Sequence, residues 1–179
     1  NRLGVALVAF MALFVLFISP MPGGGVNNSI ANHVFIFLQA PLAAIMAEKG
    51  GGRMIFTALH EGFFTQIKVG FFAALCISFP IISAQIYKFV APALYKNEKR
   101  AFLPFLIATP LLFMLGAAMV YYVVTPMAWE FFISFENAAS DGALAIEIEP
   151  RISEYLSLIM RLIFAFGLAF ELPVVLLLL

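Results

Sequence analysis

Long uncharged apolar runs, separated by short polar stretches, dominate the pattern of this chain. Residues 69–87 and 101–129 contain no charged side chain, and residues 155–179 contain only Arg161 and Glu171. A helix needs about 20 predominantly apolar residues to cross the hydrocarbon core of a membrane, and each of these runs is long enough. The pattern therefore predicts a polytopic helical membrane protein.

A further apolar run near the beginning, residues 3–18, is slightly short for a membrane span. The chain starts at Asn1 rather than at a methionine. Prolines and a glycine at residues 20–23 follow the run directly, which is not typical of a cleaved signal peptide. At the other end the chain stops inside the apolar run 172–179. We therefore interpret the first run as a membrane span and expect the chain to be a fragment of a longer protein.

Residues 30–47 form another uncharged apolar stretch, and the charges elsewhere indicate where it lies. If it crossed the membrane, the basic connection at residues 88–100 would face outside, against the positive-inside bias of cytoplasmic loops. With four spans instead, Arg2 and the basic connection share the cytoplasmic side. We therefore predict that residues 30–47 form an apolar helix on the outer surface. The cations of the basic connection are Lys88, Lys96, Lys99 and Arg100.

The predicted layout is a single transmembrane domain over residues 1–179, all-α, with its amino terminus in the cytoplasm. Prolines inside three of the spans remove helical hydrogen bonds and bend the helices, which favours kinked helices that form a cupped bundle. We expect spans near residues 3–19, 64–87, 102–129 and 153–179, an external cap at 20–63, a cytoplasmic loop at 88–101 and an external loop at 130–152.

Composition supports the membrane class and argues against several others. Hydrophobic residues make up 64% of the chain and charged residues 11%, with a mean hydropathy of +1.05, which excludes a soluble domain. The lone Cys76 cannot form a disulfide, and His33 and His60 lack metal-binding spacing. No phosphate-binding glycine motif is present, and a net charge of zero does not suit nucleic acid. We expect no catalysis, metal, cofactor or nucleic-acid partner.

Glu171 is an ionisable residue in a nearly pure apolar run. Such a residue costs about 2.5–3.5 kcal/mol on insertion scales, so it usually faces protein or a water-filled cavity. The structural alternative is an interhelical hydrogen bond made by a protonated carboxyl. Arg161 lies seven residues after Glu154 and on nearly the same helix face, and the favoured interpretation is an ion pair between the two near the outer surface.

Glu98 is a lone carboxylate among the cations of the basic connection. One interpretation is a helix-end residue favoured by the helix dipole, and another is a weak surface pair with Lys99 or Arg100. The functional interpretation is a cytoplasmic acceptor for a guanidinium, which a carboxylate can hold through two hydrogen bonds. The residues alone leave these interpretations open.

The basic connection and its flanking segments resemble those of a known family. The segment F-V-A-P-A-L-Y-K-N-E-K-R (residues 89–100) closely resembles the cytoplasmic loop of TatC, the receptor subunit of the twin-arginine protein translocase. The resemblance covers essentially the whole chain, although the family's E-L-R-x-R-L motif survives only as Asn1-Arg2-Leu3. The family also has six spans, whereas this chain supplies four. Other segments that resemble the family's second and fourth spans are residues 61–68, 79–87, 155–157 and 165–173.

The resemblance implies a receptor for signal peptides with two consecutive arginines, in a translocase that exports folded precursors by the proton-motive force. It implies that Glu98 contacts the arginine region, that Phe89 is needed on the same surface, and that Arg2 belongs to the partly missing signal-peptide site. Glu171 matches the family's intramembrane carboxylate, which faces a groove that partner helices enter. The implied partners are TatA- and TatB-type subunits, other TatC copies and membrane lipid, in the inner membrane of a prokaryote.

A secondary transporter or proton channel, with Glu171 and Arg161 as a proton relay, is the alternative from another class. The spans contain no chain of acidic or histidine residues and no pair of broken helices in corresponding positions. We therefore prefer the prediction of a signal-peptide receptor to that of a transporter or proton channel.

Overall fold

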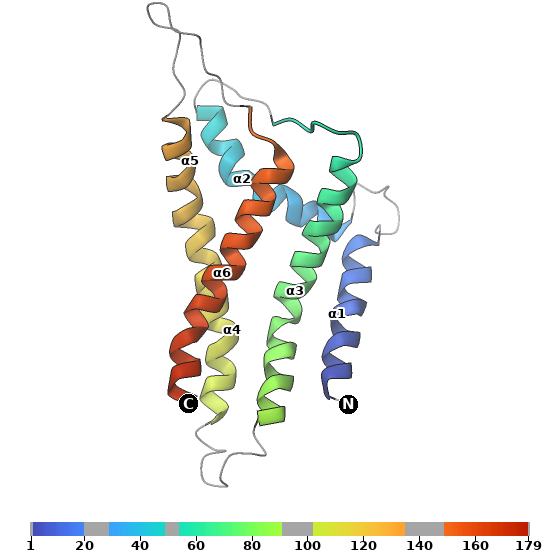
Figure 1. Cartoon of the computed structure of the whole chain (residues 1–179), viewed down its shortest axis with the longest axis vertical. Helices are drawn as coiled ribbons and strands as arrows, with labels where there is room; N and C mark the ends of the chain where they lie inside the picture. Colours follow the sequence, from blue (N-terminus) through green and yellow to red (C-terminus); the bar gives the residue numbers. More distant parts are fainter. Residues whose placement is uncertain (1, 20–28, 49–53, 91–101, 135–148, 179) are drawn as a thin grey trace, which may run out of the picture.

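The described part of the chain is almost entirely helical. The computed structural model describes residues 2–19, 29–48, 54–90, 102–134 and 149–178 (Figure 1). Within these ranges there is no strand, only an isolated bridge, so the predicted all-α class is confirmed. The elements are α1 (Arg2–Ile18), α2 (Ile30–Glu48), α3 (Glu61–Val90), α4 (Phe102–Met119), the π-helix η3 (Val120–Val124), α5 (Thr125–Ile133) and α6 (Ile152–Leu178).

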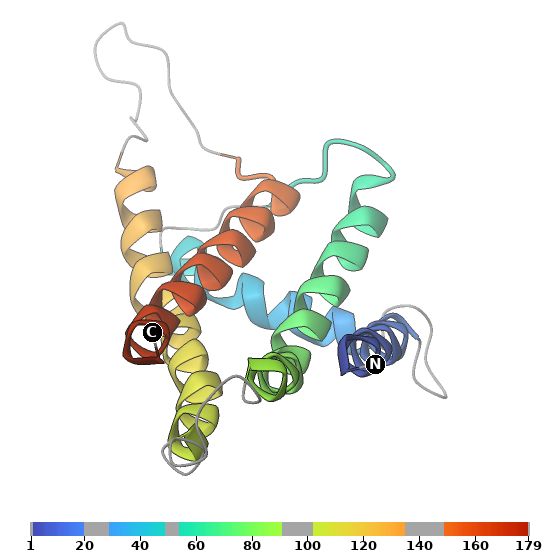
Figure 2. The same ribbon diagram turned by 60° about the horizontal axis from the view of Figure 1, so that its bottom comes forward.

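The long helices run along the long axis of the molecule, whereas α2 crosses them obliquely (Figures 1 and 2). By length and composition, α2, α3, α6 and the helical rod formed by α4, η3 and α5 could each cross a membrane, while α1 is a shorter apolar helix. Composition therefore does not separate α2 from the predicted spans, and its oblique course sets it apart only in direction (Figure 1). The helix bounds lie close to the predicted spans, and the membrane placement of each helix stays a prediction.

The rod of α4, η3 and α5 remains continuous although a proline interrupts its hydrogen bonding. Pro126 has no N–H to donate to the preceding turn, so the regular ladder must change near this point. Just before it, the backbone N–H of Thr125 donates to the carbonyl of Val120, and its hydroxyl donates to the same oxygen at 2.8 Å. This wider π-turn lets the predicted third span continue into α5 as a single rod.

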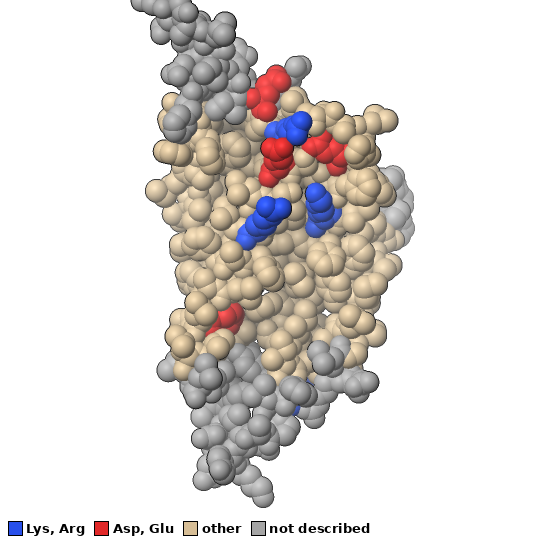
Figure 3. Space-filling view, viewed as in Figure 1, with Lys and Arg blue, Asp and Glu red and all other residues tan. Residues whose placement is uncertain are grey.

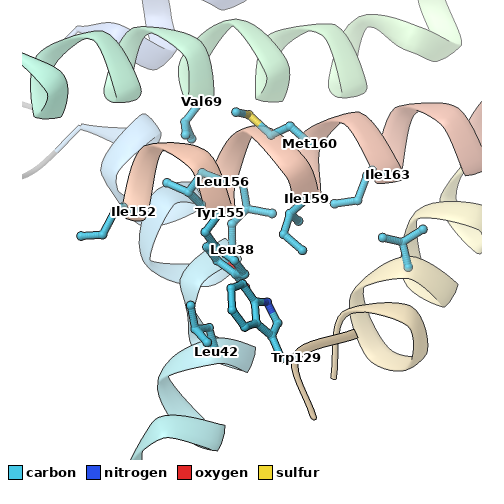
Figure 4. Close-up of a cluster of buried hydrophobic side chains, with 11 residues drawn as sticks. Leu38, Leu42, Val69, Trp129, Ile152, Tyr155, Leu156, Ile159, Met160 and Ile163 are labelled. Carbon is cyan, nitrogen blue, oxygen red and sulfur yellow. The ribbon is translucent and has the colours of Figure 1, made fainter. Parts of the chain in front are cut away.

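A cluster of buried apolar side chains lies mainly where α2, α5 and the first half of α6 meet (Figure 4). Trp129 of α5 and Tyr155 of α6 are neighbours, with ring centroids 5.3 Å apart. Leu38 and Leu42 of α2 and Leu156 of α6 belong to the same cluster and are buried. Because lipid tails are as apolar as these side chains, close packing rather than exclusion of water holds such a cluster together in a membrane. The cluster fixes α2 across one end of the bundle.

Two tyrosines from different elements donate hydrogen bonds to neighbouring carbonyls of α2. Pro41 lacks an N–H, which leaves the carbonyl of Phe37 without its helical donor. The hydroxyl of Tyr121 donates to this carbonyl at 2.7 Å, and its ring stacks on the ring of Phe37 at a centroid distance of 4.4 Å. The hydroxyl of Tyr155 donates to the carbonyl of Leu38 at 2.8 Å in a buried position. The weakened turn of α2 is therefore supported by both η3 and α6.

Tyr155→Phe is expected to lower the free energy of unfolding by about 1 kcal/mol, because it removes one buried hydrogen bond and keeps the ring packing. Thermal unfolding of the purified protein in detergent measures this change. Tyr122→Phe is the matched control, since Tyr122 is exposed and its hydroxyl is not part of this support for α2. Equal melting temperatures for the two variants would mean that the hydroxyl of Tyr155 contributes nothing.

Candidate functional site

The predicted signal-peptide residues fall at one end of the molecule, as far as the structure describes them. Arg2 begins α1 and Phe89 lies in the last turn of α3, although the positions of their side chains are not described. The start of α1, the end of α3 and the start of α4 all lie at this end (Figure 1). Glu98 lies outside the described residues. The roles of these three residues stay predictions.

Glu171 is described and is buried in the interface between α6 and α4. Its side chain is 7% exposed and lies beside the hydroxyl of Thr109 and the backbone of Phe113. Its Oε1 atom is buried and has no hydrogen-bond partner among the described residues. A buried acceptor without a partner costs about 1–3 kcal/mol, so such a group is rare unless it serves a function. The carboxyl is therefore positioned by α4 but only partly satisfied by it.

A very close approach of α4 and α6 fixes the position of this carboxyl. A Cβ atom on Gly116 would lie 2.7 Å from the carbonyl oxygen of Phe166, and one on Gly167 would lie 2.5 Å from the ring of Phe113. The ring of Phe113 in turn stacks on Phe79 of α3 at a centroid distance of 4.1 Å. Gly167 lies four residues before Glu171 and thus on the same face of α6. Close packing at Gly167 thus holds the carboxyl of Glu171, one turn further along α6, against α4.

A second polar cluster joins the starts of α3 and α6 at the opposite end of these helices. The carboxylate of Glu61 accepts hydrogen bonds from the backbone N–H of Thr57 at 2.6 Å and from the hydroxyl of Ser153. Beside it, the backbone N–H of Ile152 donates to the carbonyl of Ile55 at 3.3 Å. These hydrogen bonds connect the first turns of α3 and α6. They also give both carboxylate oxygens of Glu61 a donor.

The predicted pair between Glu154 and Arg161 is wrong. Glu154 pairs instead with Arg151, with 3.0 Å between Oε1 and Nη1, because Arg151 lies three residues earlier and at the helix end. Arg161 is exposed and forms no salt bridge with any described residue. It also lies ten residues before Glu171, about 15 Å along the helix at 1.5 Å per residue, with only apolar residues and glycine between them. This arrangement gives no support to a proton relay between Arg161 and Glu171.

Sequence reasoning missed the residues that hold Glu171 in place. Thr109 and Gly116 lie in the apolar third run, where nothing in the sequence indicates which positions face α6. Gly167 could have been found, because a small residue four positions before an intramembrane carboxylate suggests close helix packing on that face. The sequence does not show which helices pack together, and this information is needed to find Thr109 and Gly116.

The described residues thus define a polytopic class of helical membrane protein with a buried, partly satisfied carboxyl at a helix crossing. Comparison with known proteins identifies the family: the model of the Sec-independent protein translocase protein (TatC) matches residues 1–179. The chain therefore belongs to the TatC family. Members of this family are components of a protein translocase and are not known enzymes.

Individual relatives agree with this assignment. A Sec-independent protein translocase protein TatC of Magnetococcus marinus is 44% identical over 178 residues, which cover 99% of this chain and 59% of the relative. The TatC protein of Escherichia coli is 40% identical over 149 residues, covering 83% of this chain and 55% of the relative. The chain thus spans between half and two thirds of the length of these curated relatives.

A solved structure agrees with the described fold. The crystal structure of a twin-arginine translocase receptor, TatC, superposes with a TM-score of 0.76 at 34% sequence identity. The superposition covers 98% of this chain and 69% of that chain. The arrangement of kinked helices, including the crossing helix α2, is therefore that of this receptor.

Proposed function

We propose that this chain provides the signal-peptide-binding part of a twin-arginine translocase receptor. The observation that carries the proposal is the match of the TatC family model to residues 1–179, which include the basic connection at residues 88–100. The name of the solved relative, a twin-arginine translocase receptor, supports the same function. The substrates are folded precursors whose signal peptides carry two consecutive arginines.

Recognition takes place at the end of the molecule where α1 begins and α3 ends. Glu98 is the group of opposite charge for the signal peptide, because a carboxylate binds a guanidinium through two charge-assisted hydrogen bonds. Phe89 contributes the aromatic group that the family resemblance implies for this contact, and Arg2 belongs to the same signal-peptide site. The positive-inside bias of the four cations in the connection supports placing this end in the cytoplasm of a prokaryotic cell, with the protein in its inner membrane.

Glu171 provides a separate contact for partner subunits within the membrane. Its buried Oε1 lacks a partner among the described residues, and a polar group of an incoming helix would supply one. The partners proposed for this position are TatA- and TatB-type helices, and other TatC copies complete the complex. Membership of the TatC family supports export driven by the proton-motive force, as the resemblance implies.

Glu98→Gln in the full-length protein is expected to weaken binding of an R-R signal peptide about 10- to 100-fold. A hydrogen bond to a charged group contributes about 1.5–3 kcal/mol, and glutamine keeps the size of the side chain but not its charge. Photo-crosslinking of a precursor to the purified receptor measures the binding, with a K-K version of the same peptide as reference. Phe89→Ala is expected to weaken binding as well.

Lys96→Ala is the matched control, because it changes the same connection without removing the acceptor. It is expected to bind the R-R peptide nearly as well as the unmodified receptor. If Glu98→Gln crosslinks the R-R peptide at the normal level, Glu98 is a helix-end residue and the proposed recognition is wrong.

A further inference from the structure

A pocket of about 290 Å³ opens between α3 and the first half of α6, before the turn that carries Glu171. Two cations line it, Lys68 from α3 and Arg161 from α6. The rest of its wall is mainly apolar and includes Phe71, Leu75 and Phe164. The pocket therefore combines two positive charges with an apolar wall, and neither is used by the recognition end or by the carboxyl at the helix crossing.

The acidic side chains near this pocket are already engaged with other groups. The carboxylate of Glu61 accepts hydrogen bonds at the start of α3, and Glu154 pairs with Arg151 at 3.0 Å. Lys68 and Arg161 form no salt bridge with any residue that the structure describes. Figure 3 shows charged side chains gathered over the upper parts of α3 and α6, with a broad surface below them that carries little charge. The two cations of the pocket therefore have no ion-pair partner among the described residues.

Both cations lie inside the helices rather than at their ends. Lys68 follows the first residue of α3 by seven positions and Arg161 follows that of α6 by nine, about 10 Å and 14 Å along the helices. This depth corresponds to the boundary between headgroups and acyl chains if the helices cross a membrane as predicted. Long basic side chains are stable there when they meet an anionic group.

We propose that this pocket binds one anionic phospholipid, with its phosphate between Lys68 and Arg161. The phosphodiester oxygens accept hydrogen bonds from the ammonium and the guanidinium, as in other basic pockets between membrane helices. One acyl chain lies along the apolar wall of the pocket. Phe71 in this wall is 48% exposed, so a chain would cover apolar surface there. A lipid with a net negative charge is preferred, because a choline headgroup would bring a third cation to the pocket.

The charge and the shape of the pocket favour a lipid over a soluble anion or a protein helix. A soluble phosphate would satisfy the cations but would leave the wall formed by Phe71, Leu75 and Phe164 uncovered. A protein helix would have to bring an acidic side chain to this depth, where such residues are costly. A phospholipid carries the negative group and the apolar chain at the matching depths in one molecule.

The test is native mass spectrometry of the full-length protein in non-ionic detergent, titrated with phosphatidylglycerol or phosphatidylcholine. The double variant Lys68→Gln/Arg161→Gln is expected to bind phosphatidylglycerol about 30-fold more weakly, since each cation near a membrane surface contributes about 1 kcal/mol. Binding of phosphatidylcholine should change little. Arg151→Gln removes a cation that already has a partner and is expected to leave binding unchanged. Exchanging the two cations, Lys68→Arg with Arg161→Lys, should retain the binding of phosphatidylglycerol.

Several outcomes would overturn the proposal. Equal affinity of the double variant and the unmodified protein for phosphatidylglycerol would mean that the cations do not bind the headgroup. Competition by glycerol phosphate at the same concentration as the lipid would indicate a simple phosphate site. In membranes, a photo-reactive residue at Leu75 should form lipid adducts, and capture of a protein helix there in place of lipid would assign the pocket to a partner.

Discussion

Gly116→Ala is expected to destabilise the protein by about 1–3 kcal/mol, and Gly116→Val is expected to prevent accumulation of folded protein. The added Cβ would lie 2.7 Å from the carbonyl oxygen of Phe166 and 3.0 Å from the Cα of Gly167, both backbone atoms of α6. Backbone atoms cannot turn away as a flexible side chain can, so α4 and α6 must separate. Because membrane helices associate chiefly through close packing, the separation loses contacts along the whole crossing.

Gly62→Ala provides a matched control for this prediction. A Cβ atom on Gly62 would lie 3.7 Å from the ring of Phe56, which is ordinary van der Waals contact. Alanine is favoured over glycine in a helix by up to about 1 kcal/mol, so this variant is expected to be neutral or slightly stabilised. Thermal unfolding in detergent compares the two variants. A melting temperature of Gly116→Ala at or above that of Gly62→Ala would show that the crossing is not close-packed.

The helices could be predicted from sequence because each depends on local composition. The uncharged runs predicted α3, the rod of α4 to α5, and α6 to within a few residues, and the stretch at residues 30–47 is helical as expected. Helices in a membrane must satisfy their own backbone hydrogen bonds, so an apolar run of this length leaves the chain little choice. The loop motif similarly gave the family, because it is a continuous segment.

The contacts between helices could not be predicted in the same way. Glu154 and Arg161 share a helix face, yet Arg151 lies closer and at the helix end, and it pairs with Glu154 instead. The close approach at Gly116, and the donation by Tyr155 to the carbonyl of Leu38, join positions that are distant in sequence. A uniformly apolar helix such as α4 carries no polar face that would orient it. Only the assembled helices define these pairs.

Glu171 combines a cost for stability with a proposed role, and the two effects can be separated. Its Oε1 is buried without a partner among the described residues, so removing the carboxyl should stabilise the isolated protein. Thr109, which lies beside it, can turn its hydroxyl to a carbonyl of its own helix and lose little. Groups held in costly positions in this way are typical of sites that lower stability in favour of function.

Glu171→Leu in the full-length protein is therefore expected to raise the melting temperature and to abolish most export. Glu171→Gln keeps a hydrogen-bonding group of the same size and should retain substantial export, with Glu171→Ala retaining less. Binding of R-R signal peptides should survive all three changes, because the contact proposed for Glu98 and Phe89 is separate from Glu171. The measurements are thermal unfolding, export of a folded precursor, and crosslinking of TatA- or TatB-type helices beside position 171.

The combination of results distinguishes a partner site from a structural hydrogen bond. If Glu171→Leu melts at a lower temperature than the unmodified protein, the carboxyl stabilises the crossing of α4 and α6, and its unsatisfied oxygen does not lower stability. If Glu171→Leu exports precursor and crosslinks partner helices as the unmodified protein does, no partner uses the carboxyl. If Glu171 is a docking group, Glu171→Leu should be more stable than the unmodified protein, should lose crosslinking to partner helices and should still bind signal peptides. This combination would mean that the buried oxygen serves an incoming helix rather than the crossing itself.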